Sequence, residues 1–144
     1  MTERIQFIVP VVPVAQPRAR ATIRASHAAV YEASSGHAIH AFKASVRLAA
    51  RDAYQGPPLQ GPLQVDVLFV LPRPRKLLWK TKPMPRLRHT IKPDRDNLDK
   101  GVLDSLRGTM FIDDCQVCCG TIEKWIAAGD EQPFVGVTIV PLAS

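Results

Sequence analysis

The sequence predicts an α+β domain, with a mixed β-sheet of about four strands and two helices packed mainly on one face. Three patterns support this fold. Residues 63 to 71 carry an apolar side chain at every second position, which is typical of a strand with one buried face. Residues 38 to 54 repeat apolar side chains at helical spacing, and residues 98 to 107 do so over a shorter stretch. Residues 1 to 144 are expected to form a single domain.

The N-terminal third is predicted to supply an edge strand, an arm and the longest helix. Apolar side chains alternate from Arg4 onward until two prolines interrupt the hydrogen-bonding ladder. Residues 16 to 31 carry Arg18 and Arg20 among small side chains, and we expect a hairpin or an extended arm there. The two arginines either contact DNA phosphates or simply face water. The longest helix is then expected over residues 38 to 54.

The most basic segment of the chain is residues 72 to 89. Its four prolines argue against a continuous helix or a central strand, so we expect an exposed loop. Trp79 within this loop either stacks on unpaired DNA bases or packs against the core. The expected DNA contacts are this tryptophan and the cations Arg73, Arg75, Lys76, Lys80 and Lys82.

Two strands are expected after the second helix, over residues 116 to 127 and 134 to 141, and we predict that they pair as an antiparallel hairpin. The three cysteines, Cys115, Cys118 and Cys119, are an odd number and do not suit a disulfide framework. We expect reduced thiols. A zinc site is not expected, because the histidines offer no second pair of ligands.

The net charge favours a polyanionic partner. Lys and Arg number 19 against 13 Asp and Glu, which leaves a charge of +6 at pH 7 and a pI of about 9.6. Nucleic acid is the first candidate. No apolar run approaches the roughly 18 residues that a membrane helix needs, and residues 1 to 6 show no signal-peptide pattern. We therefore expect a cytoplasmic protein without a membrane partner.

Acidic residues gather around the second helix, between residues 92 and 114. Asp94 and Asp96 are two residues apart, so in an extended approach to the helix their carboxylates project to the same side. Either Asp96 or Asn97 is expected to be the N-cap of a helix that stops at Gly108. The two carboxylates can therefore share one ion.

Lys100 lies within the same helix, four residues after Asp96 and four before Asp104, near enough to interact with both. The residues after the helix are expected to turn the chain back toward its start. Asp113 and Asp114 follow this turn, so a third carboxylate can reach the first pair.

Three carboxylates in one place repel one another unless a divalent cation binds or some of them are protonated. Mg²⁺ fits best, because it takes hard oxygen ligands and bridges carboxylates to phosphate oxygens, and Mn²⁺ is the expected substitute. Lys100 can add positive charge at a transferring phosphoryl group. The alternative is that the aspartates only cap a helix and shape turns.

The acidic constellation resembles the motif of the RusA-type Holliday junction resolvases, an Asp-x-Asp-Asn-x-x-Lys segment followed later by Asp-Asp. The matching positions of the first part are Asp94, Asp96, Asn97 and Lys100, and those of the second part are Asp113 and Asp114. The resemblance implies that Asp94, Asp96 and Asp114 bind the metal and that Lys100 is catalytic. Supporting roles are implied for Asn97, Asp104 and Asp113.

The resemblance also implies a RusA-like architecture, a homodimer and a crossover junction endodeoxyribonuclease. Such an enzyme resolves four-way junctions and related branched DNA in recombination and repair. It would act in the cytoplasm of a bacterial or phage-infected cell, and a prophage could encode it. A two-fold dimer suits the cutting of two opposed strands. The residues themselves leave two alternatives open: a flap or fork nuclease that uses the same site, and a non-catalytic basic module that binds nucleic acid.

Overall fold

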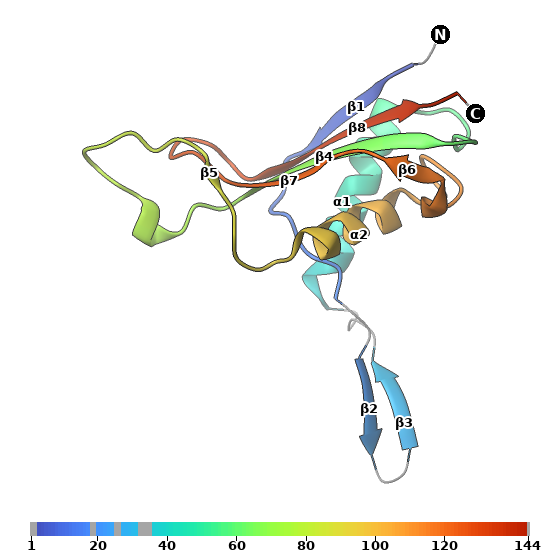
Figure 1. The fold of residues 1–144 in the computed structure, drawn as a ribbon, viewed down its shortest axis with the longest axis horizontal. Helices are drawn as coiled ribbons and strands as arrows, with labels where there is room; N and C mark the ends of the chain where they lie inside the picture. The colour runs from blue at the N-terminus through green and yellow to red at the C-terminus, as the bar shows by residue number, and fades with distance from the viewer. Residues whose placement is uncertain (1–2, 18–19, 25–26, 32–35, 144) are drawn as a thin grey trace.

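The computed structural model describes residues 3–17 and 36–143, together with the backbone of residues 20–24 and 27–31. Its main sheet has six strands in the order β1-β8-β4-β7-β5, with β6 pairing to β4 beside this path (Figure 1). The strands are β1 (Ile5–Val9), β4 (Leu63–Leu71), β5 (Leu87–Arg88), β6 (Val117–Cys119), β7 (Ile122–Ile126) and β8 (Phe134–Pro141). The predicted α+β class is confirmed. About four strands was too few, because the short strands β5 and β6 leave no periodic pattern in the sequence.

Strand β4 is the centre of the sheet and pairs antiparallel with β8 and parallel with β7. The predicted hairpin between residues 116 to 127 and 134 to 141 is therefore wrong, since β4 lies between β7 and β8. The first of these segments is also divided at Gly120, which has a φ of 138°. A Cβ atom there would lie 1.8 Å from the Val65 carbonyl oxygen, so only glycine fits where the chain passes from β6 to β7.

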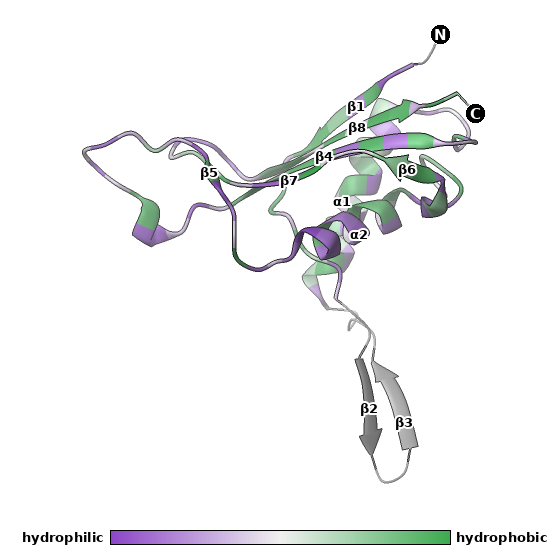
Figure 2. Ribbon diagram, in the orientation of Figure 1, coloured by the Kyte–Doolittle hydropathy of each residue, from purple (hydrophilic) through white to green (hydrophobic). Residues whose placement is uncertain are grey.

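Helices α1 (Ala38–Ala53) and α2 (Arg95–Leu106) pack on the same face of the sheet, as predicted (Figure 1). Apolar side chains of both helices pack against the inward side chains of the strands. Figure 2 shows the hydrophobic stretches of the strands and helices in green. The core includes Phe42, Val46, Leu98, Val102 and Leu106 from the helices and Leu63, Val65, Val67 and Phe69 from β4. Neither helix, nor any other helix in the described parts of the chain, is long and apolar enough to cross a membrane.

The predicted arm is a two-stranded hairpin, with β2 (Arg20–Arg24) antiparallel to β3 (His27–Tyr31). It extends away from the sheet and helices as a separate projection (Figure 1). Two expected DNA contacts fall in this region. Arg18 lies outside the described residues, and Arg20 begins β2 with its side chain outside the described part.

Candidate active site

Asp94 begins the acidic segment and is the N-cap of α2, where either Asp96 or Asn97 was expected. Its backbone does the capping: the Asp94 carbonyl accepts a hydrogen bond of 3.1 Å from the Leu98 amide. Its side chain is exposed and makes no capping hydrogen bond. The carboxylate of Asp94 is therefore not required to start the helix, which removes the simple capping explanation for this residue.

The chain that leads into Asp94 is fixed to the sheet by Lys124, a residue of β7. The Lys124 ammonium donates hydrogen bonds of 2.8 Å to the carbonyl oxygens of Ile91 and Pro93. The peptide bond between Lys92 and Pro93 is cis. Sequence reasoning missed this role, because the partners of Lys124 are backbone carbonyl oxygens more than thirty residues away in the chain. Lys124 thus positions the approach to the site without belonging to the motif.

A second support comes from the strap of residues 14 to 16, which crosses the first turns of α2. The Gln16 amide donates a hydrogen bond of 2.9 Å to the Asn97 carbonyl. The strap runs close to Gly101: a Cβ atom there would be in ordinary van der Waals contact with it, 3.4 Å from the Val14 carbonyl oxygen and 3.6 Å from the Gln16 nitrogen. The strap and the start of α2 therefore form one fixed unit.

The second acidic group is the Asp113–Asp114 pair, which begins the short 3₁₀ helix η2 (Asp114–Gln116). Gln116 holds this turn in place from both ends of its side chain. Its Oε1 accepts hydrogen bonds from the backbone of Ile112 (2.8 Å) and Asp113 (2.9 Å). Its Nε2 donates to two carbonyl oxygens of the loop before β4, each at 3.0 Å. Sequence reasoning missed Gln116, because its partners are backbone atoms far away in the chain.

The two carboxyl groups of this pair interact strongly. A hydrogen bond that the protonated Asp114 carboxyl donates to Asp113, followed by partial burial and the charges of Asp113 and Asp104, raises the pKa of Asp114. The same hydrogen bond lowers the pKa of Asp113, which also lies 3.5 Å from the Arg107 guanidinium. The pair therefore tends to share one proton, the expected behaviour of crowded carboxyl groups without a cation.

Lys100 lies between the two acidic groups on α2, with its ammonium 3.7 Å from Oδ2 of Asp104. The predicted interaction with Asp104 is confirmed. Lys43 of α1 approaches the same oxygen at 4.0 Å. Asp104 is thus flanked by two lysines, and the Lys100 side chain remains 58% exposed, free enough to move toward a bound anion.

The structure brings Asp104 near Asp114, but Asp94 lies at the other end of α2, about 15 Å away along the helix axis. Asp96 is exposed in the first turn of the helix. Within the described parts of the chain, no three His, Cys, Asp or Glu side chains are gathered closely enough to hold a metal ion. The donor chemistry suits a hard divalent cation. The joint site of Asp94, Asp96 and Asp114 stays a prediction.

The basic loop, defined as residues 72 to 89, is held in a defined conformation by contacts among its own residues. It contains the 3₁₀ turn η1 (Arg75–Leu77). Arg73 organises it by donating hydrogen bonds to the carbonyl oxygens of Leu77 (2.6 Å), Pro85 (2.8 Å) and Ala127 (3.2 Å). Its guanidinium also lies 4.8 Å from the ring centre of Trp79, which Lys82 approaches at 4.1 Å. Trp79 therefore packs within the loop and is not part of the hydrophobic core.

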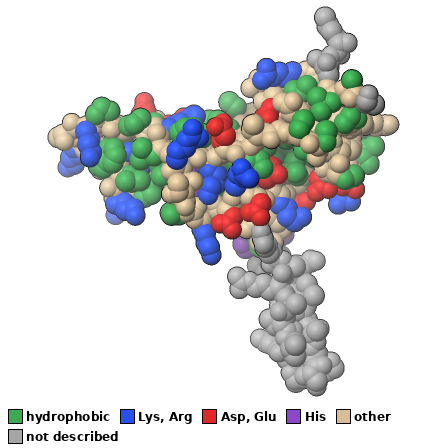
Figure 3. Space-filling view, in the orientation of Figure 1, with side chains coloured by type: hydrophobic (Ala, Val, Ile, Leu, Met, Phe, Trp, Pro, Cys, Tyr) green, Lys and Arg blue, Asp and Glu red, His purple; other side chains and the backbone are tan. Residues whose placement is uncertain are grey.

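The cations of the basic loop fall into two groups. Arg86 forms a bidentate ion pair with Glu131, and Arg88 lies 3.7 Å from Glu123. The exposed cations that make none of the ion pairs found among the described residues are Arg75, Lys76, Lys80 and Lys82, and of these Lys82 lies over the Trp79 ring. Figure 3 shows basic side chains spread over this projecting loop, while acidic side chains gather lower on the body. The loop therefore presents a cationic surface.

The fold and the site together define a basic α+β protein with acidic groups along one helix and a cationic loop, a surface suited to nucleic acid. The chain belongs to the RusA family: the family model described as "Endodeoxyribonuclease RusA" matches residues 10–140. A Bacillus subtilis (strain 168) protein, named "Uncharacterized protein YqaN", is 33% identical to it over 140 residues. That match covers 94% of each chain.

Proposed function

We propose that this protein is a Mg²⁺-dependent, structure-selective endonuclease that resolves Holliday junctions and related branched DNA by phosphodiester hydrolysis. Membership of the RusA endodeoxyribonuclease family supports the nuclease activity. The observation that carries the proposal is the Asp94 carboxylate, which is exposed and makes no capping bond although it occupies the N-cap. An acidic side chain without a structural task, at a position fixed by Lys124 and by the strap, is well placed for chemistry.

In this proposal, carboxylate oxygens of Asp94, Asp96 and Asp114 would hold the cation. Its binding would have to draw together acidic groups that lie at opposite ends of α2. An ion held by these residues would lower the pKa of the attacking water and stabilise charge on the leaving oxygen. Asp113 raises the pKa of Asp114 through their shared hydrogen bond, so a bound ion would have to compete with the proton for this carboxylate.

Lys100 leaves Asp104 to meet the charge that develops on the phosphoryl oxygens. The helix geometry supports this role, because Lys100 projects from α2 one turn after Asp96 and its side chain is 58% exposed. Asn97 and Asp104 act in support. The Asn97 carbonyl anchors the strap, and Asp104 holds Lys100 between turnovers.

The DNA backbone would follow the basic loop toward Asp94. Arg75, Lys76 and Lys80 are exposed for phosphate contact, whereas Arg73 and Trp79 are occupied in holding the loop together. Two copies of the chain related by a two-fold axis would place two active sites on opposed strands of a junction. The proposed homodimer thus matches the two-fold symmetry of the proposed DNA substrate.

The test is cleavage of synthetic DNA by the purified protein with Mg²⁺, and with EDTA as the control. Four-way junctions, flaps, forks and linear duplexes of matched sequence are compared. We expect paired nicks on opposed strands of the junction and little cleavage of the duplex. Faster cleavage of flaps or forks would favour the fork nuclease. Tight binding without any cleavage in Mg²⁺ or Mn²⁺ would favour the non-catalytic binding module.

A further inference from the structure

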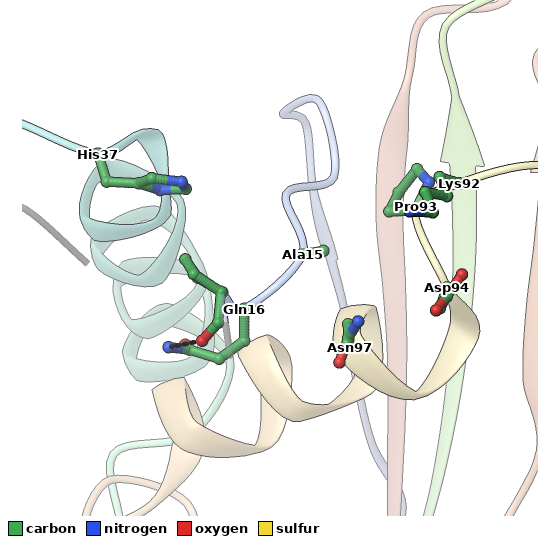
Figure 4. Close-up of a pocket in the computed structure, with 8 residues that line it drawn as sticks. Ala15, Gln16, His37, Lys92, Pro93, Asp94 and Asn97 are labelled. Atoms are coloured by element: carbon green, nitrogen blue, oxygen red, sulfur yellow. Dashed lines mark hydrogen bonds between the residues drawn. The ribbon is translucent and has the colours of Figure 1, made fainter. Parts of the chain in front are cut away.

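A hollow of about 690 Å³ adjoins the proposed cleavage site and has Asp94 in its wall. Its lining comes from three parts of the chain: the strap (Ala15, Gln16), the N-cap of α1 (His37) and the start of α2 (Lys92, Asp94, Asn97). Figure 4 shows Gln16 between the two helices, with His37 on one side and Asp94 on the other. A volume of this size can accept a ligand as large as a nucleotide.

Gln16 provides the main chemical clue. Its Oε1 atom is buried and has no hydrogen-bond partner among the residues that the structure describes, and within the same residues its Nε2 makes one long bond, 3.4 Å to the Pro17 carbonyl. Buried polar atoms in proteins nearly always have a partner, so an unpaired acceptor beside a hollow calls for a donor from a ligand. The backbone of Gln16 is fixed by its bond to Asn97, so the side chain is held at this position.

The other lining groups are polar and differ in charge. The Nδ1 of His37 accepts a hydrogen bond of 3.0 Å from the Ile39 amide, so a neutral His37 carries its proton on Nε2 and can donate from there. Lys92 is exposed and cationic. A ligand that matches these groups carries an N–H donor for Gln16, an acceptor for His37 and an anion for Lys92. A nucleotide has all three.

We propose that this hollow binds the nucleotide next to the scissile phosphate and that Gln16 reads its base. The inference rests on the proposed nuclease function and adds a specificity subsite to it. Adenine, cytosine and guanine offer an exocyclic amino group to the Gln16 acceptor. Thymine offers only its ring N3–H, which is flanked by two carbonyl oxygens that would repel the Gln16 oxygen. The subsite therefore discriminates against thymine at one position beside the cut.

The first experiment tests binding without catalysis. The metal-free protein is titrated with dAMP, dCMP, dGMP and dTMP, and chemical shifts are followed by NMR at Gln16, His37 and Asn97. We expect these signals to move with the three amino-bearing nucleotides and to move less with dTMP. Gln16→Ala should weaken binding of the amino-bearing nucleotides about fivefold, the effect of one hydrogen bond. Gln60→Ala, an exposed glutamine in the loop before β4, is the matched control and should behave as wild type.

The second experiment measures cleavage of four-way junctions in which each base around the cut is varied. We expect Gln16→Ala to reduce the ratio of cleavage rates between preferred and disfavoured bases at one position about fivefold. Base preferences at the other positions and the requirement for a junction should not change. An unchanged sequence profile, or equal shifts with all four nucleotides, would overturn the subsite while leaving the nuclease intact. Selective shifts at Gln16 in a protein that cleaves no DNA would support the subsite and reject the nuclease.

Discussion

The ammonium of Lys124 lies 2.8 Å from the Pro93 carbonyl oxygen, so a strand in the sheet holds the residue directly before Asp94. A second bond of the same length reaches Ile91. The chain on both sides of Lys92 is therefore fixed by one side chain. A lysine outside the recognisable motif thus places the first acidic residue of the motif.

Lys124→Met tests this placement. The substitution keeps the aliphatic stem but leaves two carbonyl oxygens without their charged donor, so we expect a loss of about 1 to 3 kcal/mol in the free energy of unfolding. Cleavage should fall more than junction binding, because the DNA contacts of the basic loop remain. Thermal melts, gel shifts and cleavage rates measure the three effects. Arg51→Met, which removes an exposed cation on α1, should change none of them.

The basic loop should supply affinity through its unpaired cations. Replacing Arg75, Lys76 and Lys80 together by alanine should weaken junction binding. The slope of log Kd against log salt should also fall, by roughly 0.9 for each DNA phosphate that the variant no longer neutralises. Binding measured across a range of NaCl concentrations gives this slope. An unchanged slope would exclude the loop as a DNA-binding surface.

Arg73→Ala serves as the contrasting variant for the basic loop. This arginine bonds three carbonyl oxygens within and beside the loop, so its loss should disorder the loop itself. We expect faster amide hydrogen exchange and proteolysis between residues 72 and 89 in this variant. The triple variant should keep the wild-type pattern of protection. If both variants were proteolysed to a similar extent, Arg73 would not differ from Arg75, Lys76 and Lys80 in its role. That result would contradict the separation of one cation that stabilises the loop from three that contact DNA.

Lys100 should act in turnover. Lys100→Ala should fold and bind junction DNA but cleave roughly a hundredfold more slowly, as expected for the loss of a charge that stabilises the transition state. Lys43→Ala removes the other lysine beside Asp104 and should cleave at close to the wild-type rate. Single-turnover rates separate the two variants. A near-normal rate for Lys100→Ala would leave Lys100 only as the partner of Asp104.

The Asp113–Asp114 pair predicts a pH dependence of cleavage. Asp114 must be ionised to bind a cation, and its hydrogen bond with Asp113 raises its pKa. Activity should therefore fall toward acid as Asp114 takes up its proton. Asp113→Asn removes the neighbouring charge and leaves an amide that donates to Asp114, so the pKa of Asp114 should fall. The acid limb of the cleavage profile should move to lower pH, and a shift to higher pH would contradict the assignment.

Local patterns in the sequence predicted the parts of the fold that depend on periodicity. The alternating side chains from Leu63 to Leu71 indicated the central strand, and the spacing of Ile39, Phe42 and Val46 indicated the longest helix. The pairing of strands was not predictable in the same way. Gly120 interrupts the segment before β7 because the Val65 backbone lies against it, and this close approach joins residues far apart in the chain.

The candidate site shows the same division between local and distant signals. The motif located Asp94, Lys100 and Asp114 by type and spacing. It did not predict that Lys124 and Gln116 hold the acidic segments, because both bind backbone carbonyl or amide groups, which carry no signature in the sequence. Nor did it predict that Asp94 caps α2 through its backbone alone.

The central claim is that Asp94, Asp96 and Asp114 bind one divalent cation. The most direct measurement compares Mg²⁺-dependent junction cleavage by the three single Asp→Asn variants with that by Asp99→Asn.

Asp99 lies on the same helix, but it is half-buried, and burial raises its pKa above the ordinary value of 3.8. The folded state therefore binds the proton of the Asp99 carboxyl group more tightly than the unfolded state does. At higher pH, where Asp99 is ionised, its buried charge opposes folding. Asp99→Asn should melt at or above the wild-type temperature at pH 7, and any gain should vanish at acid pH.

We expect Asp99→Asn to cleave junctions at close to the wild-type rate. Each of the other three variants should lose cleavage while still folding, and each should bind metal-free junction DNA as tightly as wild type or more so, because a negative charge facing phosphate has been removed. Thermal melts and gel shifts without metal establish folding and binding. Retained cleavage in any one of the three variants would remove that aspartate from the site, and retained cleavage in all three would contradict the account.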